Sequence, residues 1–148
     1  TPCEHSFPTR RSSDLIDMKK LDNVIIMASI VERETSDKNE KAKVASVFYN
    51  RLKKDMKLQS CATVLYSLGK HKEKLYNKDL EVKSPYNTYK VTGLPIGPIC
   101  NPGKESIKAA LSPTKTNYLY FVLSNDGKHF FTDDYNKFLK VKDVTQGF

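Results

Sequence analysis

The segment LDNVIIMASIVERETSDKNEKAKVASVFYNRLKK, residues 21–54, decides the fold, because two helical patterns follow each other in it. Over residues 16–34, apolar side chains recur at spacings of three and four and cover a wide arc, which predicts a largely buried helix. The next helix places four apolar side chains on one face: Val44, Val47, Phe48 and Leu52. Asp37 and Glu40 have the spacing of a capping box, which predicts where this second helix begins.

The rest of the chain mixes irregular segments, helices and strands. Residues 56–103 show no regular pattern and are punctuated by Pro and Gly, so we expect a long irregular segment that forms a cleft. Downstream, the expected elements are a helix at 104–111, strands at 118–123 and 129–132 with a turn at 125–127 between them, and a last helix at 134–144. Two helices, a cleft-forming segment, an antiparallel hairpin and a C-terminal helix indicate an α+β domain.

Composition narrows the function classes. The 148 residues suit one domain, and 25 Lys and Arg against 17 Asp and Glu give a formal charge of +8. That charge favours anionic partners, but scattered lysines do not distinguish nucleic acid from cell-wall polymers. The longest apolar runs are far shorter than the roughly 18–20 residues of a membrane span. The three cysteines lack metal-ligand spacing, so no zinc site is expected.

Cys61 and Cys100 leave two alternatives, a disulfide or two free buried thiols, and the absence of a motif favours free thiols. Residues 1–15, TPCEHSFPTRRSSDL, do not resemble the rest of the chain and look like a translated adapter sequence. We therefore set them aside as a non-native segment and treat residues 16–148 as the domain, whose native chain is expected to continue upstream.

Glu34 is the strongest catalytic candidate. Its spacing places it on the same helix face as Met27, Ile30 and Val31, which is expected to be buried. Burial raises the pKa of a carboxyl group, and the protonated form is the one that can donate a proton to a glycosidic oxygen. The alternative is that Glu34 only caps the helix end or pairs with an arginine. Glu32 points about 160° away around the helix, toward solvent, and is the second candidate.

Other polar residues are open to two interpretations each. Arg51 lies on the inward face of its helix and needs a partner, which could be Glu32, Glu34 or a backbone carbonyl. The segment SPYNTY, residues 84–89, has the rings, hydroxyls and amide typical of sugar recognition, and also the composition of a well-bonded turn. His129 could orient a substrate group or be purely structural.

Several separated motifs, in this order, resemble the YceG-like family: MASIVERET (27–35), KVASVFYNRLKKDMKLQS (43–60), SPYNTYKVTGLPIGPICNPG (84–103), AALSP (109–113), YLYFV (118–122) and the Gly-Lys-His-Phe turn (127–130). The resemblance covers roughly residues 20–142. It implies an endolytic murein transglycosylase that cuts glycan strands of nascent peptidoglycan at the extracytoplasmic face of the bacterial membrane. Such a protein would be held there by an N-terminal membrane helix outside this chain, with cell-wall synthases as candidate partners and no nucleic acid.

The resemblance also implies site residues. Glu34 matches the family's catalytic glutamate, the second Glu of its I-[IV]-E-x-E-T stretch. Matches to other recurrent polar positions suggest cleft residues: Asn50, Arg51, Gln59, Thr63, Tyr66, Tyr86, Asn87, Thr88, Tyr89, His129 and Asn136. Two departures stand out: Cys61-Ala62 replaces the Asp-Pro of many members, and Ile96 replaces a proline.

One essential carboxylate predicts a lytic mechanism without metal or cofactor. Glu34 would protonate the oxygen between N-acetylmuramic acid and N-acetylglucosamine, then deprotonate the C6 hydroxyl to close a 1,6-anhydro ring. Two rivals remain open. One is a non-catalytic basic module that binds glycan or nucleic acid, and the other is a muramidase-type hydrolase with Asp79 or Asp126 as its second carboxylate.

Overall fold

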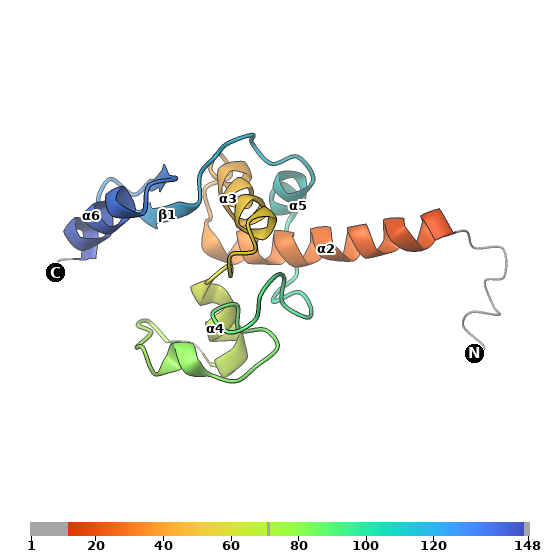
Figure 1. Cartoon of the computed structure of the whole chain (residues 1–148), viewed down its shortest axis with the longest axis horizontal. Coiled ribbons are helices and arrows are strands. Elements are labelled where there is room, and N and C mark those ends of the chain that lie inside the picture. Colours follow the sequence, from red (N-terminus) through yellow and green to blue (C-terminus); the bar gives the residue numbers. More distant parts are fainter. Residues whose placement is uncertain (1–11, 71, 147–148) are drawn as a thin grey trace.

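Figure 1 shows the computed structural model, which describes the backbone of residues 12–70 and 72–146 and the side chains of residues 20–70 and 72–144. Residues 1–11 of the segment that we set aside lie outside the described residues. The first described helix, α2, begins at Ser12, before the predicted boundary at residue 16.

The architecture is α+β, which confirms the predicted fold class. In chain order the elements are α2 Ser12–Glu34, α3 Lys41–Lys53, α4 Cys61–Leu68, the short helix η1 Asp79–Glu81, α5 Lys104–Leu111, β1 Tyr120–Leu123, β2 His129–Thr132 and α6 Tyr135–Gln146. In Figure 1, α3 and α5 lie on one side of α2 and α4 on the other, while the hairpin and α6 lie together beyond the C-terminal end of α2.

The core forms where α2, α3 and α5 meet. The α2 residues from Val24 to Val31 are almost all buried, as the periodicity predicted, and Met27 and Ile30 are fully enclosed. Phe48 of α3 packs against this cluster. Each such buried side chain contributes about 1.5–3 kcal/mol through removal of apolar surface from water. Burial begins at Val24, whereas Leu21, which the apolar spacing placed on the same helix pattern, is 58% exposed.

The hairpin joins the core through aromatic contacts. Antiparallel pairing sets Tyr120 opposite Thr132 and Leu123 opposite His129, and Gly127, with φ of 82°, supplies the turn. The ring of Phe121 meets that of Phe48 edge-on, with centroids 5.7 Å apart. The helix α6 packs against both strands of the hairpin.

The first strand is shorter than predicted for a physical reason. The carbonyl of Tyr118 accepts a hydrogen bond from Asn50 Nδ2 at 2.9 Å, and that of Leu119 accepts one from Arg51 Nε at 2.7 Å. These carbonyls are therefore bonded to α3 side chains rather than to a strand, and β1 begins only at Tyr120.

The predicted capping box is wrong. Glu40 occupies the position before α3, but its carboxylate makes no capping bond. It bonds instead to His129 on β2, while Asp37 accepts a hydrogen bond from the Asn39 N–H at 2.8 Å within the turn. A long-range partner has replaced the local one.

The expectation of an irregular segment over residues 56–103 is only partly right. Residues 61–68, in the middle of it, form the regular helix α4. Gly69 ends this helix in the left-handed conformation, with φ of 69°. The remainder consists of turns and η1, so the segment wraps around α4.

Candidate active site

Glu34 is the last residue of α2, and its half-buried side chain lines a cavity of about 370 Å³ between the helix cluster and the hairpin. The walls come from α3, the segment before α4, β1 and α6. Besides Glu34 the lining residues are Val47, Phe48, Arg51, Leu58, Gln59, Ser60, Cys61, Leu80, Tyr89, Leu119, Tyr120, Phe121, Val122, Tyr135, Phe138 and Lys142. Among the described residues around this cavity, Glu34 is the sole carboxylate.

Two opposing influences act on the Glu34 carboxyl group. Burial is the larger and raises its pKa, because a charged carboxylate loses hydration there. The Ser60 hydroxyl donates a hydrogen bond to Oε1 at 2.5 Å, and the Ala62 N–H and the charge of His129 also favour the ionised form. The net pKa shift is upward. The site therefore favours a protonated Glu34 and holds donors in place for its ionised form.

The donors reach Glu34 because α4 begins beside it. Gln59 has a positive φ of 51°, which turns the chain so that Ser60 precedes the first turn of the helix. Thr88 fixes this geometry: its Oγ1 accepts from the Ser60 N–H at 2.9 Å and lies 2.8 Å from Thr63 Oγ1. The N-terminus of a helix carries partial positive charge, which adds to the stabilisation of an anion there.

Arg51 bonds to backbone carbonyls, one of the three alternatives left by the sequence. It donates to the carbonyls of Leu119 and Lys57, each at 2.7 Å, and its guanidinium lies 5.2 Å from the Tyr120 ring centroid. Burial lowers its pKa. Because no acidic residue is bonded to it in the described part of the chain, Arg51 brings positive charge to the cavity wall without pairing with Glu34.

The structure divides the predicted cleft residues into groups. Arg51, Gln59 and Tyr89 line the Glu34 cavity. Tyr66 and Tyr86 line a second cavity of about 800 Å³, on the α4 surface that carries Leu65 and Ser67. Their rings lie 4.7 Å apart. The two groups therefore line different cavities, the second of which runs along α4 as far as Gly69 and Lys70.

Four other predicted residues serve the scaffold. Thr63, Asn87 and Thr88 are fully buried, so they present no surface to a sugar in this conformation. Asn50 ties α3 to the segment before β1 through the carbonyls of Thr116 and Tyr118, both at 2.9 Å. These contacts correct the expectation that all four lie on the cleft surface.

Asn136 and His129 complete the predicted set. Asn136 is exposed in the first turn of α6, where its N–H donates to Asp134, and it lines neither cavity. His129 pairs with Glu40, with Nδ1 and Oε2 2.8 Å apart, and its ring meets Phe121 of the cavity wall at 5.4 Å. His129 is therefore adjacent to the site, whereas Asn136 is not part of it.

Glu32 does not point into solvent as predicted. Its Oε1 accepts hydrogen bonds from the Gly103 N–H at 2.9 Å and from the Ser106 hydroxyl at 2.8 Å. The Gly103 bond is the main cause of its lowered pKa, followed by the Ser106 bond. Glu32 thus anchors the start of α5 as a carboxylate, which disfavours it as a proton donor.

Sequence reasoning missed several contributors to the site. Ser60, Ala62, Glu40, Tyr120 and Lys142 were not selected, although each contacts or lines the region around Glu34 or His129. A serine directly before an apolar helical turn is a signal for an N-cap and could have identified Ser60. The other four depend on contacts between elements far apart in the chain, and their local sequence gives no signal.

Cys61 and Cys100 are free thiols, not a disulfide, and Cys61 is exposed rather than buried as expected. Within residues 12–70 and 72–146, no cluster of three or more His, Cys, Asp or Glu side chains suits a metal ion. None of the described helices combines the length and apolar character that crossing a membrane requires.

Comparison with known proteins identifies the family of the chain. A model of the YceG-like family matches residues 5–143. The chain belongs to the YceG-like family. It is 50% identical over 131 residues to a protein of Bacillus subtilis named endolytic murein transglycosylase, and this match covers 86% of this chain and 36% of that protein. A Streptococcus pneumoniae protein of the same name is 35% identical over 120 residues, 77% of this chain and 22% of that protein.

A solved structure agrees with the family assignment. The crystal structure of a yceG-like protein from Listeria monocytogenes superposes with a TM-score of 0.77 at 47% identity, and the match covers 87% of this chain and 42% of that chain. The chain thus spans about a third or less of the length of these curated relatives, and less than half of the solved one.

Proposed function

We propose that the protein is an endolytic murein transglycosylase, as its relatives are named, and that Glu34 is its single acid and base. The observation that carries this proposal is that Glu34 is the sole carboxylate among the described residues lining its cavity. Most inverting and retaining glycosidases use two carboxyl groups, which flank the scissile bond. A site with one carboxyl group suits a reaction in which the substrate supplies the nucleophile.

In the first step, protonated Glu34 donates its proton to the oxygen that links N-acetylmuramic acid to N-acetylglucosamine, and the bond from C1 to that oxygen breaks. Burial supports this step because it keeps the carboxyl group protonated. The resulting carboxylate gains the hydrogen bond from the Ser60 hydroxyl at 2.5 Å and that from the Ala62 N–H. These donors stabilise the negative charge that proton transfer leaves on Glu34.

In the second step, the carboxylate of Glu34 takes the proton of the muramoyl C6 hydroxyl, and that oxygen bonds to C1 to form the 1,6-anhydro ring. The acid is regenerated and no water is consumed. The walls support binding of a sugar chain, since Tyr89, Tyr120 and Phe121 offer aromatic faces. Arg51 and Lys142 bring positive charge, which suits the carboxylates of the lactyl and peptide groups of murein.

The second cavity is our candidate for further sugar units of the same strand. It combines the ring pair of Tyr66 and Tyr86 with two cations, Arg33 and Lys70. An endolytic enzyme must hold chain on both sides of the bond that it cuts, and a second cavity lined by α4 residues suits that need. Gly97 allows the close approach of Tyr86, because a Cβ there would lie 3.1 Å from its hydroxyl oxygen.

The hydrolase alternative lacks a placed second carboxylate. Asp79 is bonded to Lys72 Nζ at 2.8 Å, and its pKa is lowered chiefly by that contact. Asp126 lies in the hairpin turn, where it accepts hydrogen bonds from the Ser124 hydroxyl and the Lys128 N–H. Neither lines the Glu34 cavity.

Murein lies outside the cytoplasmic membrane, so the proposal places the protein at the extracytoplasmic face, with glycan strands as substrate. Attachment through an upstream membrane helix and cooperation with cell-wall synthases are parts of the same proposal. The protein would need no metal or other cofactor for this chemistry.

The test is mass spectrometry of muropeptides after incubation of purified peptidoglycan with the wild type, Glu34→Gln and Glu32→Gln. Glu32→Gln is the matched control, because Glu32 lies two positions before Glu34 on the same helix but contacts the start of α5 instead of the cavity. We expect anhydro-muramoyl ends from the wild type and the control and none from Glu34→Gln. Reducing ends would identify a hydrolase, and cleavage by Glu34→Gln would remove Glu34 from the mechanism.

A further inference from the structure

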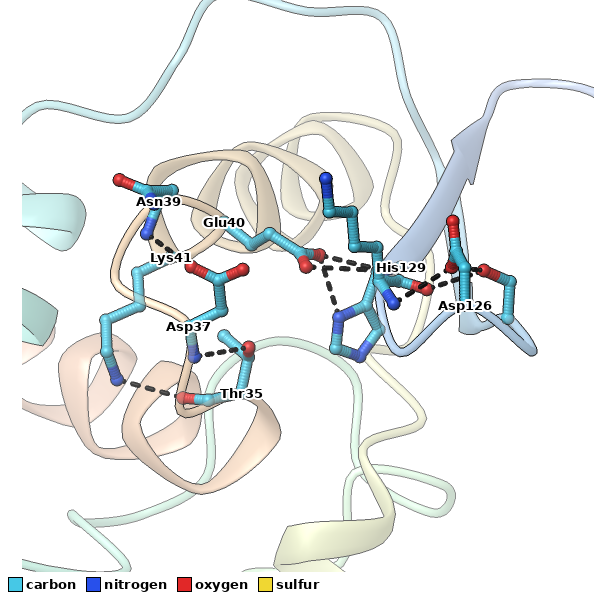
Figure 2. Close-up of polar contacts among 9 residues, drawn as sticks. Thr35, Asp37, Asn39, Glu40, Lys41, Asp126 and His129 are labelled. Atoms are coloured by element: carbon cyan, nitrogen blue, oxygen red, sulfur yellow. Dashed lines mark hydrogen bonds and ion pairs between the residues drawn. The ribbon is translucent and has the colours of Figure 1, made fainter.

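A buried carboxylate and an imidazole form a pair beside the Glu34 cavity. Glu40 precedes α3 and His129 begins β2, and their side chains are only 10% and 12% exposed. Figure 2 shows the two side chains directed at each other across the space between α3 and the hairpin. Glu40 Oε2 lies 2.8 Å from His129 Nδ1, and the His129 backbone N–H donates to the same carboxylate at 3.0 and 3.3 Å.

This geometry selects one form of the ring. A carboxylate can only accept a hydrogen bond, so the proton of the neutral imidazole must be on Nδ1. A partner on one ring nitrogen fixes both the tautomer and the orientation, and so determines what the other nitrogen can do. In the neutral ring Nε2 is therefore an acceptor.

His129 Nε2 is left available. No described residue hydrogen-bonds to it, and no fully enclosed side-chain nitrogen or oxygen among the described residues lacks a partner. Nε2 is therefore open to solvent or to a ligand.

The ring also lies next to the site. Its centroid is 5.4 Å from that of Phe121, which lines the Glu34 cavity, and the two rings meet edge to face. His129 is also close enough to Glu34 for the protonated form of its ring to lower the pKa of that carboxyl group. His129 is not among the residues lining the cavity, so a glycan bound at Glu34 reaches the imidazole only by extending past Phe121, and amino sugars carry hydroxyl and acetamido N–H donors for that contact.

We propose that Glu40 is a positioning residue, which holds His129 in the Nδ1–H tautomer so that Nε2 accepts a hydrogen bond from a hydroxyl or acetamido N–H of the bound glycan. The proposal rests on the proposed function for the identity of the ligand. Glu40 itself does not touch the sugar and acts only through His129.

The first measurement is the tautomer of His129 in the ligand-free protein, read from its imidazole ¹⁵N chemical shifts above the pH at which the ring titrates. We expect the Nδ1–H form in the wild type and a shift toward Nε2–H in Glu40→Ala. Asp37→Ala is the matched control, because Asp37 lies in the same turn but its carboxylate accepts a hydrogen bond from the Asn39 N–H and does not contact His129 (Figure 2). A wild-type ring in the Nε2–H form would overturn the proposal.

The second measurement is binding of soluble glycan strands of alternating N-acetylglucosamine and N-acetylmuramic acid, with every variant in the Glu34→Gln background so that no cleavage interferes. We expect Glu40→Ala to weaken binding by about 3- to 10-fold, as loss of one oriented hydrogen bond implies. Glu40→Gln keeps an acceptor oxygen at similar length and should retain most of the affinity, provided thermal unfolding shows both variants folded.

A double-mutant cycle separates positioning from a general structural effect. In a His129→Ala background, Glu40→Ala should cause no further loss of affinity, because its effect passes through the imidazole. An additional loss of the same size, or unchanged binding after the tautomer has switched, would overturn the proposal. Failure of the proposed function would appear differently, as absence of glycan binding by the Glu34→Gln protein itself, while the tautomer result would still stand.

Discussion

Asn87 offers a sharp test of whether a residue matched to the family's polar positions binds sugar or holds the site together. Its side chain is fully buried and makes three hydrogen bonds. Nδ2 donates to the carbonyls of Leu80 and Val82 at 3.0 and 2.7 Å, and Oδ1 accepts from the Tyr89 N–H at 2.9 Å. The amide therefore ties η1 and the residue that follows it to the turn that carries Thr88 and Tyr89.

Asn87→Ala removes all three bonds at once. With a net contribution of about 0.5–1.5 kcal/mol for each, and with some rehydration of the freed groups, we expect a loss of about 2–4 kcal/mol in the free energy of unfolding. Asn87→Asp should be worse than alanine, because a carboxylate would face the two carbonyl oxygens that now accept from Nδ2. Chemical denaturation followed by circular dichroism measures both losses.

The matched control is Asn136→Ala, an exposed asparagine that should change stability by less than about 0.5 kcal/mol. For Asn87→Ala, the remaining folded protein should keep its KM for glycan strands. Unchanged stability together with a raised KM would refute the scaffold assignment and return Asn87 to the substrate-binding set.

Three further predictions concern the two cavities. The pKa of Glu34 is raised in the folded state, so the contribution of this group to stability is complete below the unfolded pKa of 4.5 and is lost as pH rises through the folded pKa. Glu34→Gln should therefore match the wild type in Tm near pH 4 and have the higher Tm at alkaline pH. Ala62→Pro removes an N–H that favours ionised Glu34, so the alkaline limb of the pH–rate profile should move to higher pH, while Ala62→Gly, which keeps the amide, should not move it. Tyr66→Ala removes a ring that is 45% exposed, so glycan binding should weaken by about 2- to 12-fold, for a ring contact of about 0.5–1.5 kcal/mol, with little change in Tm.

The parts of the fold that could be predicted are those that repeat a local period. The buried face of α2 follows directly from the spacing of apolar residues, α5 ends as predicted shortly before Pro113, and the Asn125-Asp126-Gly127 turn gives the hairpin. The helix α4 was missed as a helix because it has only eight residues, Cys61–Leu68, and lies within a Pro- and Gly-rich stretch. Too few turns were present for the period to be distinguished from a strand.

The candidate site was predictable only where a side chain broke its local pattern. Glu34 stands out because a carboxylate on an apolar helix face requires an explanation. Glu40 does not, since a glutamate three residues after an aspartate is already explained as a cap. Its actual partner, His129, is 89 residues further along the chain, and only the tertiary structure brings the two together. The same holds for Thr88, whose position beside Ser60 and Thr63 no spacing could indicate.

The replacement at Cys61-Ala62 then acquires a physical meaning. Where many members of the family have proline at the second of these positions, this chain has an alanine whose N–H hydrogen-bonds to the catalytic candidate Glu34. Proline is accepted in the first turn of a helix because the amide there has no intrahelical partner, so the fold tolerates either residue. In this chain the amide of Ala62 and the hydroxyl of Ser60, which donates at 2.5 Å, both favour the ionised carboxylate of Glu34. A proline at position 62 would leave Ser60 as the donor and would raise the pKa of Glu34, because proline has no N–H to donate.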